Sequence, residues 1–235
     1  MCLYIYTFAF VCFSTHIMAG MEKLDFPGKI EVFYYDKVQT SFYSKPLQKV
    51  TVSDKLLYVI PGVITPSIHS ALFLEHTQIY AGEEVLDIGT GSGVQGIFAA
   101  DFARKVVSTD ISSIAVKNAE INVKLHRLEK IVEVREGDLF GPINRDERFD
   151  VVLFNIDPPS TKEELGLWKV HERFFEEVGT YLKPSGRIYY QGTAMNYIPR
   201  VRQMAMKNKF RIMKLDMLTS VSKNQEPYVL LIQRY

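Results

Sequence analysis

Cysteine is almost absent from this chain. The two cysteines, Cys2 and Cys12, both lie in the first twenty residues. A disulfide framework and a cysteine-ligated metal site are therefore excluded for everything that follows. His69, His76, His126 and His171 are scattered and show no close His/Glu spacing of the kind that binds metal ions. We therefore expect no metal site.

The chain also lacks an excess of charge of either sign. It has 28 basic and 27 acidic residues, a net charge of +1. Composition alone thus gives no general attraction for nucleic acid, although a local basic patch would be sufficient for binding. An apolar fraction of 47% and a charged fraction of 23% are ordinary for a soluble globular protein. At 235 residues, one domain with a small extension can bury a substantial core.

Lysine and arginine are missing from residues 1–20, which are apolar and aromatic and end in Met-Ala-Gly. A signal peptide would begin with positive charge. A membrane span would be longer and better flanked. A third explanation, which we favour, is a start assigned too early, with the protein beginning at Met18 or Met21. We leave this segment out of the fold prediction and expect no membrane association.

Residues 21–80 are expected to form a small β extension and a leading helix. Residues 49–52 and 56–60 are rich in β-branched and aromatic side chains, which favours two short strands joined by a turn at Ser53 and Asp54. A helix follows, for which we predict Thr65 as the cap and Pro66 as the first helical residue.

Strand and helix patterns alternate through residues 81–235, the expected main domain. Alternation of this kind predicts a parallel sheet covered by helices on both faces. We expect strands at 84–88, 105–110, 131–136, 149–155, 187–191, 210–217 and 228–233, and helices at 94–100, 112–125, 163–182 and 198–208. Ligands of such sheets bind at the carboxyl ends of the strands, where Asp87, Asp110, Asp138 and Asn155 stand.

The most informative stretch runs from Val85 to Gly93. An apolar strand ends at Asp87, and Gly89, Gly91 and Gly93 follow at alternate positions before a helix. Strand, glycine turn and helix make a nucleotide-type cofactor site. A phosphate-binding turn would be free of negative charge, because the helix amino end meets an anion there. Asp87 instead suits a ligand with hydroxyl groups and positive charge.

A dinucleotide site is the alternative for this stretch. Residues 91–96 fit the G-x-G-x-x-G fingerprint, and Asp110 follows about 20 residues on. The match is short, and Asp87 would lie unfavourably close to a pyrophosphate, so we disfavour it.

Residues 87–93, Asp-Ile-Gly-Thr-Gly-Ser-Gly, resemble the first motif of the class I S-adenosylmethionine-dependent methyltransferases. Residues 60–66 and 70–75 are similar to the segment that precedes the core in the methyltransferase small-domain family, and residues 181–188 to its approach to the fifth strand. That family includes ribosomal-RNA guanine, tRNA adenine and release-factor glutamine methyltransferases. The resemblance implies a Rossmann-like α/β fold with a seven-stranded, mostly parallel sheet whose last strand is antiparallel.

The resemblance also implies a cofactor, S-adenosylmethionine, and its contacts. Asp87 would lie beside the methionine part and balance its positive charges, and Asp110 would accept from the ribose hydroxyls. Ile111 would pack on the adenine, and Asp138 would bond its amino group. The full set of implied cofactor residues is Asp87, Gly89, Thr90, Gly91, Gly93, Asp110, Ile111, Asp138, Leu139 and Asn155. A helix cap at Asp110 and an ordinary turn at Asp138 stay open as structural alternatives.

Residues 155–160, Asn-Ile-Asp-Pro-Pro-Ser, resemble the Asn/Asp-Pro-Pro-Tyr/Phe motif of methyltransferases that modify planar nitrogens. Pro158 and Pro159 would stiffen the turn, so that an oxygen accepts from the substrate amino group. Either Asn155 or Asp157 takes that role, depending on the register. Ser160 replaces the expected aromatic residue, with Trp168 and Tyr190 as the only speculative substitutes. A purely structural turn is the alternative. The Asn-Ile pair is also similar to that of the ribosomal-protein lysine methyltransferases, which lack the prolines.

We therefore expect a cytoplasmic enzyme that methylates an amino or amide nitrogen of RNA or protein. A small-molecule acceptor and a non-catalytic S-adenosylmethionine-binding subunit are the alternatives, and the oligomeric state is left open. A late basic stretch is either a phosphate contact or a solvated face; it comprises Arg200, Arg202, Lys207, Lys209, Arg211 and Lys214.

Overall fold

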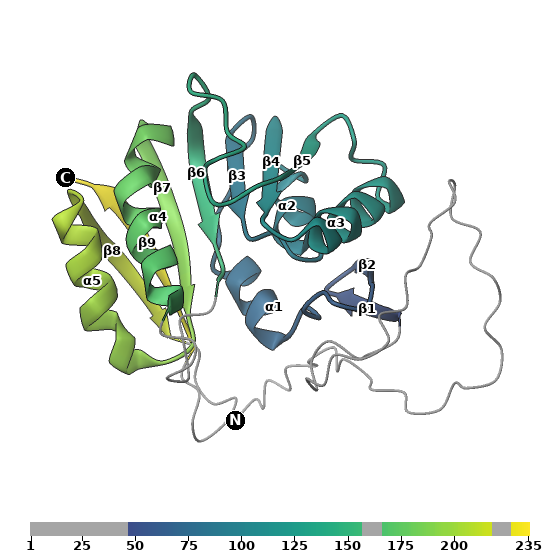
Figure 1. Cartoon of the computed structure of the whole chain (residues 1–235), viewed down its shortest axis with the longest axis horizontal. Helices are drawn as coiled ribbons and strands as arrows, with labels where there is room; N and C mark the ends of the chain where they lie inside the picture. Colours follow the sequence, from purple (N-terminus) through teal and green to yellow (C-terminus); the bar gives the residue numbers. More distant parts are fainter. Residues whose placement is uncertain (1–46, 157–165, 218–226) are drawn as a thin grey trace, which may run out of the picture.

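The computed structural model describes residues 47–156, 166–217 and 227–235. Several predictions fall outside these residues: the segment 1–20, the beginning of the β extension, the start of the helix expected at 163, and the motif residues Asp157, Pro158, Pro159 and Ser160. Figure 1 shows a twisted sheet with helices packed against it and a hairpin beside its β3–β5 half.

The predicted β hairpin is confirmed. Strands β1 (Gln48–Val52) and β2 (Lys55–Val59) pair antiparallel. Ser53 occupies the turn at a φ of 51°. Each strand begins within one residue of its predicted position, because the apolar alternation and the turn residues act in the same direction.

Helix α1 (Ile68–Glu75) begins later than predicted. Its cap is Ser67, whose hydroxyl oxygen accepts from the backbone N–H of His69 at 3.2 Å, and Ser70 completes a capping box. The prediction of Thr65 as the cap is therefore wrong. The Thr65 hydroxyl instead donates to Gln48 Oε1 at 2.9 Å, which ties the approach of the helix to the hairpin.

The sheet has the predicted seven strands, in the order β5-β4-β3-β6-β7-β9-β8. They are β3 (Glu84–Ile88), β4 (Lys105–Asp110), β5 (Val132–Glu136), β6 (Phe149–Phe154), β7 (Leu182–Gly192), β8 (Phe210–Met217) and β9 (Tyr228–Arg234). Neighbours from β5 to β7 pair parallel, and β9 is antiparallel to both β7 and β8. The strand order reverses between β3 and β6, so the carboxyl ends of these strands are the expected ligand site.

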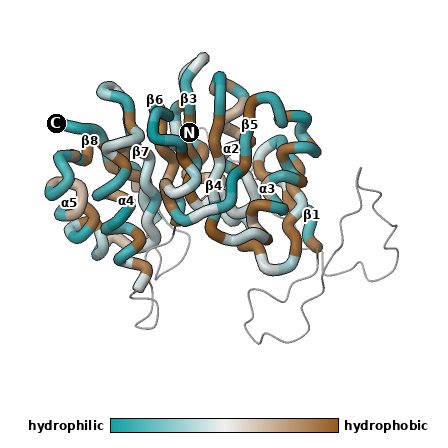
Figure 2. Tube along the Cα trace, turned by 45° about the horizontal axis from the view of Figure 1, so that its top comes forward, coloured by the Kyte–Doolittle hydropathy of each residue, from teal (hydrophilic) through white to brown (hydrophobic). Residues whose placement is uncertain are grey.

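Helices cover both faces, as predicted. Helices α2 (Val94–Ala99) and α3 (Ser113–Leu125) share one core with α1 and the hairpin, whereas α4 (Leu167–Tyr181) and α5 (Ile198–Lys207) share the other. Hydrophilic and hydrophobic segments alternate along α4 and α5 in Figure 2, as expected for helices with one buried face. Strand residues alternate between the two cores, which fixes the register of the sheet.

Strand β7 is longer than predicted, because residues 183–186 bulge out of it rather than ending the preceding helix. Phe149 pairs with Leu182, but the next pair joins Val151 to Arg187. Gly186 lies so close to Leu182 that a Cβ atom on it would stand 2.7 Å from Leu182 Cγ. The glycine is therefore required by the tight bulge and not by a helix end.

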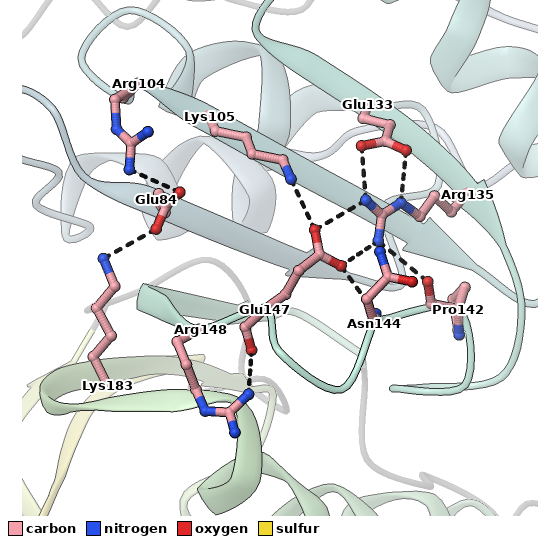
Figure 3. A network of polar contacts seen from close by, with 10 residues as sticks. All are labelled: Glu84, Arg104, Lys105, Glu133, Arg135, Pro142, Asn144, Glu147, Arg148 and Lys183. Atoms are coloured by element: carbon pink, nitrogen blue, oxygen red, sulfur yellow. Dashed lines mark hydrogen bonds and ion pairs between the residues drawn. The ribbon is translucent and has the colours of Figure 1, made fainter.

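Ion pairs cross the sheet from the first residues of the strands to β5 (Figure 3). Glu84, at the start of β3, pairs with Arg104 at 2.8 Å and with Lys183 at 3.1 Å. Glu147 accepts from Arg135 at 2.6 Å and from Lys105 at 2.8 Å. The hydrogen bond from Arg135 lowers the pKa of Glu147 to about 2. These charges neutralise one another, so this network is structural.

Candidate cofactor and acceptor site

The glycine loop between β3 and α2 is tied to the end of β4. The N–H groups of Gly89 and Thr90 both donate to the carbonyl of Thr109, at 2.8 and 2.9 Å. A further bond of 2.8 Å from the Gly93 N–H to the Thr90 carbonyl closes the turn. Gly91, with a φ of 55°, would carry a Cβ with nothing within 4 Å of it. The backbone at Gly91 is therefore open to a ligand.

Asp87 lies beneath this loop rather than on its surface. Its side chain is 1% exposed, and its Oδ2 accepts from the Thr90 hydroxyl at 2.6 Å and from the Ser108 hydroxyl at 3.4 Å. A Cβ on Gly96 would overlap Ser108 Oγ, so this small residue makes room for the cluster. Burial raises the pKa of Asp87 to about 6. These contacts make Asp87 and Thr90 supports of the loop, and their predicted contact with the cofactor stays a prediction.

Asp110, the last residue of β4, joins the glycine loop to the beginning of α3. Its Oδ2 accepts from the N–H of Gly91 and its Oδ1 from the N–H of Ser112, both at 2.9 Å. Ser112 is the N-cap of α3, so the alternative that Asp110 caps this helix is wrong. The carboxylate thus stands beside the open backbone of Gly91, and its predicted contact with a ribose stays a prediction.

The remaining predicted adenine contacts gather around Asp110. Ile111 is 70% exposed, although its side chain is apolar. The N–H of Gly137 donates to the Asp110 carbonyl at 2.9 Å, which brings Asp138 to the same edge. Asp138 forms an exposed ion pair of 2.7 Å with Arg173 of α4. The side chain of Leu139 is buried in the core, which leaves only its backbone for the predicted contact.

Asn155 stands at the end of β6, between the glycine loop and the end of β7. Phe154 pairs with Ile88 on one side and with Tyr190 on the other. The residues that follow, Gly89, Asn155 and Gln191, therefore form a row along the carboxyl edge. Ile156 packs against Gly89, on which a Cβ would lie 2.7 Å from Ile156 Cγ1. The predicted alternatives Asn155 and Asp157 stay open.

Two buried asparagines of α3 connect this helix to the hairpin and to the glycine loop, and the sequence analysis did not predict them. Asn122 donates to the carbonyls of Tyr58 and of Ser92 in the glycine loop, each at 2.8 Å, and accepts from the N–H of Tyr58. Asn118 accepts from the N–H of Ile60 at 2.7 Å. Both side chains are fully buried. Two polar residues spaced by four within an otherwise apolar helix face were the signal available in the sequence.

The speculative aromatic substitutes for Ser160 are buried: Trp168 is 4% exposed and Tyr190 is 0% exposed. Arg200 lies 4.3 Å from the centre of the Trp168 ring and pairs with Glu172. Lys207 and Lys214 of the basic stretch also have acidic partners, Glu176 and Asp216. Half of the stretch is thus engaged within the protein, which favours a solvated face over a phosphate contact.

Within residues 47–156, 166–217 and 227–235, no group of three or more His, Cys, Asp or Glu side chains is arranged to hold a metal ion. In the same ranges, no helix has the length and apolar character needed to cross a membrane.

Comparison with solved structures supports the fold. The ribosomal protein L11 methylase of Lactobacillus delbrueckii subsp. bulgaricus superimposes with a TM-score of 0.59 at 23% identity, covering 75% of this chain and 83% of that one. The M. jannaschii TYW2 structure, a complex with AdoMet, gives a TM-score of 0.61 at 18% identity, covering 82% and 89%. Both share the architecture described above.

Sequence relatives support the family. The ribosomal protein L11 methyltransferase of Halalkalibacterium halodurans is 33% identical over 151 residues, 62% of this chain and 44% of the relative. That of Caldicellulosiruptor bescii is 47% identical over 88 residues, 36% of this chain and 28% of the relative. The chain thus spans less than half the length of these relatives. The profile of the methyltransferase small domain matches residues 66–217, more than half of the sequence. The chain belongs to the methyltransferase small-domain family.

Proposed function

We propose that this protein is an S-adenosylmethionine-dependent methyltransferase that acts on an amino or amide nitrogen of a protein. One observation carries the proposal: the Asp110 carboxylate stands beside the open backbone of Gly91 at the strand-order reversal. The sequence similarities described above, to enzymes named for a ribosomal protein, favour a protein acceptor over RNA.

The residues at this edge fit the proposed cofactor. A carboxylate suits the two hydroxyls of a ribose, and Asp110 supplies one. An exposed apolar side chain suits the face of an adenine, and Ile111 is 70% exposed. Asp138 is exposed, and a carboxylate oxygen that is not bound to Arg173 can accept from an adenine amino group. When bound, the cofactor would supply an electrophilic methyl group on a positively charged sulfur.

Asn155 would act on the acceptor side. It follows β6 directly beside the glycine loop, so its side-chain oxygen can accept from the N–H of an acceptor nitrogen placed near the cofactor. Positive charge grows on that nitrogen during transfer, and an oxygen already in place stabilises it. Holding the nitrogen in line also removes much of the entropic barrier.

Labelled methyl transfer tests the proposal. The purified chain is incubated with S-adenosylmethionine labelled on the methyl group and, separately, with ribosomal proteins, deproteinised RNA and small metabolites. Label in the protein fraction is the expected result. Label in RNA or in metabolites would replace the proposed acceptor, and cofactor binding without label in any fraction would identify a non-catalytic subunit.

Thermal stabilisation separates the dinucleotide alternative. A ligand that binds only the native state raises the melting temperature. We expect S-adenosylhomocysteine to do so and NAD to leave it unchanged. The reverse result would show that residues 91–96 form a dinucleotide site.

A further inference from the structure

Two buried polar atoms lie beside the acceptor end of the site without a hydrogen-bond partner. They are Oε1 of Gln191 and Nε2 of His69, and the statement holds for the residues that the structure describes. Gln191 is 1% exposed. Buried polar atoms of folded proteins almost always have a partner, because an unmade hydrogen bond in the interior is costly. An unpartnered pair therefore calls for a ligand.

The two residues touch and are held in place by their neighbours. Gln191 Nε2 donates to the backbone carbonyl of His69 at 3.1 Å, which turns Oε1 away from that carbonyl. The His69 N–H donates to the capping hydroxyl of Ser67, so the first turn of α1 is fixed over the end of β7. On its far side, Gln191 pairs with Val229 of β9. The pair is thus preorganised.

Its position matches the acceptor half of the proposed site. Gln191 follows Tyr190, and Tyr190 pairs with Phe154, the residue before Asn155. Asn155 and Gln191 therefore stand at the same level on neighbouring strands, with the glycine loop beyond Asn155. Tyr228 also has a buried hydroxyl without a partner in the described residues, but it belongs to the core on the other face of the sheet. We leave it aside for that reason.

We propose that Gln191 and His69 position the acceptor nitrogen next to Asn155. This proposal rests on the proposed function and adds two residues to it. Gln191 Oε1 accepts an N–H of the acceptor amine, and His69 Nε2 forms the second hydrogen bond. Both atoms are buried, so the group that reaches them must be slender. The amine of an aliphatic side chain meets this requirement better than a nucleobase, since Trp168 and Tyr190 are buried and offer no stacking surface.

Kinetics with two variants tests the positioning role. The acceptor is the fraction that becomes labelled in the methyl-transfer assay. In Gln191→Leu and His69→Ala, we expect its half-saturating concentration to rise about tenfold or more, because one or two hydrogen bonds to it are lost. Affinity for S-adenosylhomocysteine should be unchanged. Gln191→Glu keeps an accepting oxygen and should recover part of the loss. The matched control is His76→Gln at the other end of α1, which should behave as wild type.

Unchanged acceptor kinetics in both variants would overturn the proposal. So would a parallel loss of S-adenosylhomocysteine binding, because the residues would then support the cofactor half or the fold. If Gln191→Leu does not fold, His69→Ala and Gln191→Glu still decide the question.

A binding measurement separates this proposal from the proposed function. The full chain, labelled with nitrogen-15 at histidine and saturated with S-adenosylhomocysteine, is titrated with N-acetyl-lysine methylamide. We expect a saturable shift of the His69 ring signals and none at His126, whose Nε2 already contacts the Leu56 carbonyl. A shift without methyl transfer to any fraction would support the subsite and refute the enzyme. Transfer to protein without a shift would refute the subsite alone.

Discussion

At the scale of single residues, Asp87 holds the glycine loop through Thr90, but burying its carboxylate costs free energy of folding at neutral pH. It is buried beneath the glycine loop, and burial raises its pKa from 3.8 to about 6. A raised pKa of an acid means that the native state favours the protonated form. The stability contribution of that form is complete below pH 3.8 and is lost as the pH rises through about 6. At neutral pH the ionised carboxylate therefore destabilises the free protein.

Replacing Asp87 with Asn should remove this dependence on pH. We compare the free energy of unfolding of Asp87→Asn with that of wild type. We expect the difference to shift in favour of the variant by on the order of 1–3 kcal/mol between pH 4 and pH 8. Denaturant unfolding at both pH values measures the difference. The same variant should bind S-adenosylmethionine more weakly, because a negative charge near the sulfonium is lost. Parallel stability profiles would show that Asp87 is not the titrating group.

Asp110 should matter more for binding than for stability. We expect Asp110→Ala to raise the dissociation constant for S-adenosylhomocysteine about tenfold or more, because the ribose loses a charged acceptor. Calorimetric titration measures this. Asp101→Ala is the control, since Asp101 is an acidic residue whose partner is Lys55, away from the glycine loop. Equal affinities in the Asp110 variant and wild type would refute the assignment.

At the scale of elements, side-chain amides attach the hairpin to the methyltransferase core. Asn122 bonds both to β2 and to the Ser92 carbonyl of the glycine loop, whereas Asn118 bonds only to the backbone at Tyr58 and Ile60. The hairpin, the loop and α3 are thus held by one buried network. Networks of this kind are sensitive to the loss of any member, because the remaining groups stay buried and unpaired.

The two asparagines provide a matched pair of variants. We expect Asn118→Ala and Asn122→Ala each to lower the free energy of unfolding by about 2–4 kcal/mol. Only Asn122→Ala should also weaken S-adenosylhomocysteine binding, since only Asn122 contacts the glycine loop, where we propose that the cofactor binds. Denaturant unfolding and calorimetry on both variants separate the effects. Equal binding losses in the two variants would show that the hairpin as a whole, and not the Ser92 contact, supports the loop.

Elements with strong periodicity were predictable, and elements set by distant contacts were not. The hairpin and the seven strands follow from alternation and from the turn residues that separate the strands. The cap of α1 was misplaced because Thr65 bonds to Gln48, a contact invisible to local patterns. The sequence does not predict the bulge at residues 183–186, because Pro and Gly favour both a bulge and a helix end. At the site, the acids at the strand ends are visible in the sequence. The proposed role of His69 and Gln191 is not, because it depends on their burial and on the hydrogen bonds that their neighbours leave unmade.

At the scale of the whole molecule, the ion-pair network around Glu147 and the cluster at Asp110 differ in their charge balance. The network around Glu147 neutralises its own charges. At the carboxyl edge, Asp138 is paired with Arg173, whereas Asp110 accepts only from the backbone N–H groups of Gly91 and Ser112 among the described residues. Hydrogen bonds lower the pKa of Glu147 from 4.5 to about 2. Its stabilising contribution is therefore complete above pH 4.5 and is lost as the pH falls towards 2.

Acid unfolding should report this network. We expect Glu147→Gln to lower stability at pH 7 by about 1–3 kcal/mol and to flatten the decline of stability between pH 5 and pH 2. Circular dichroism during acid titration measures the profile. Glu129→Gln is the control, because Glu129 is an exposed acid that lies shortly before β5, the strand that carries Arg135. A decline as steep as that of wild type would assign acid sensitivity to other carboxylates.

The hydrogen bonds from Asn118 and Asn122 to β2 also limit how far the chain can be shortened. The family match begins at residue 66, but a protein that begins there would lack Tyr58 and Ile60, the backbone partners of the buried side chains of Asn118 and Asn122. Such a fragment would leave two buried amides of α3 without these partners, so a stable fragment needs the β1–β2 hairpin from Gln48 onward.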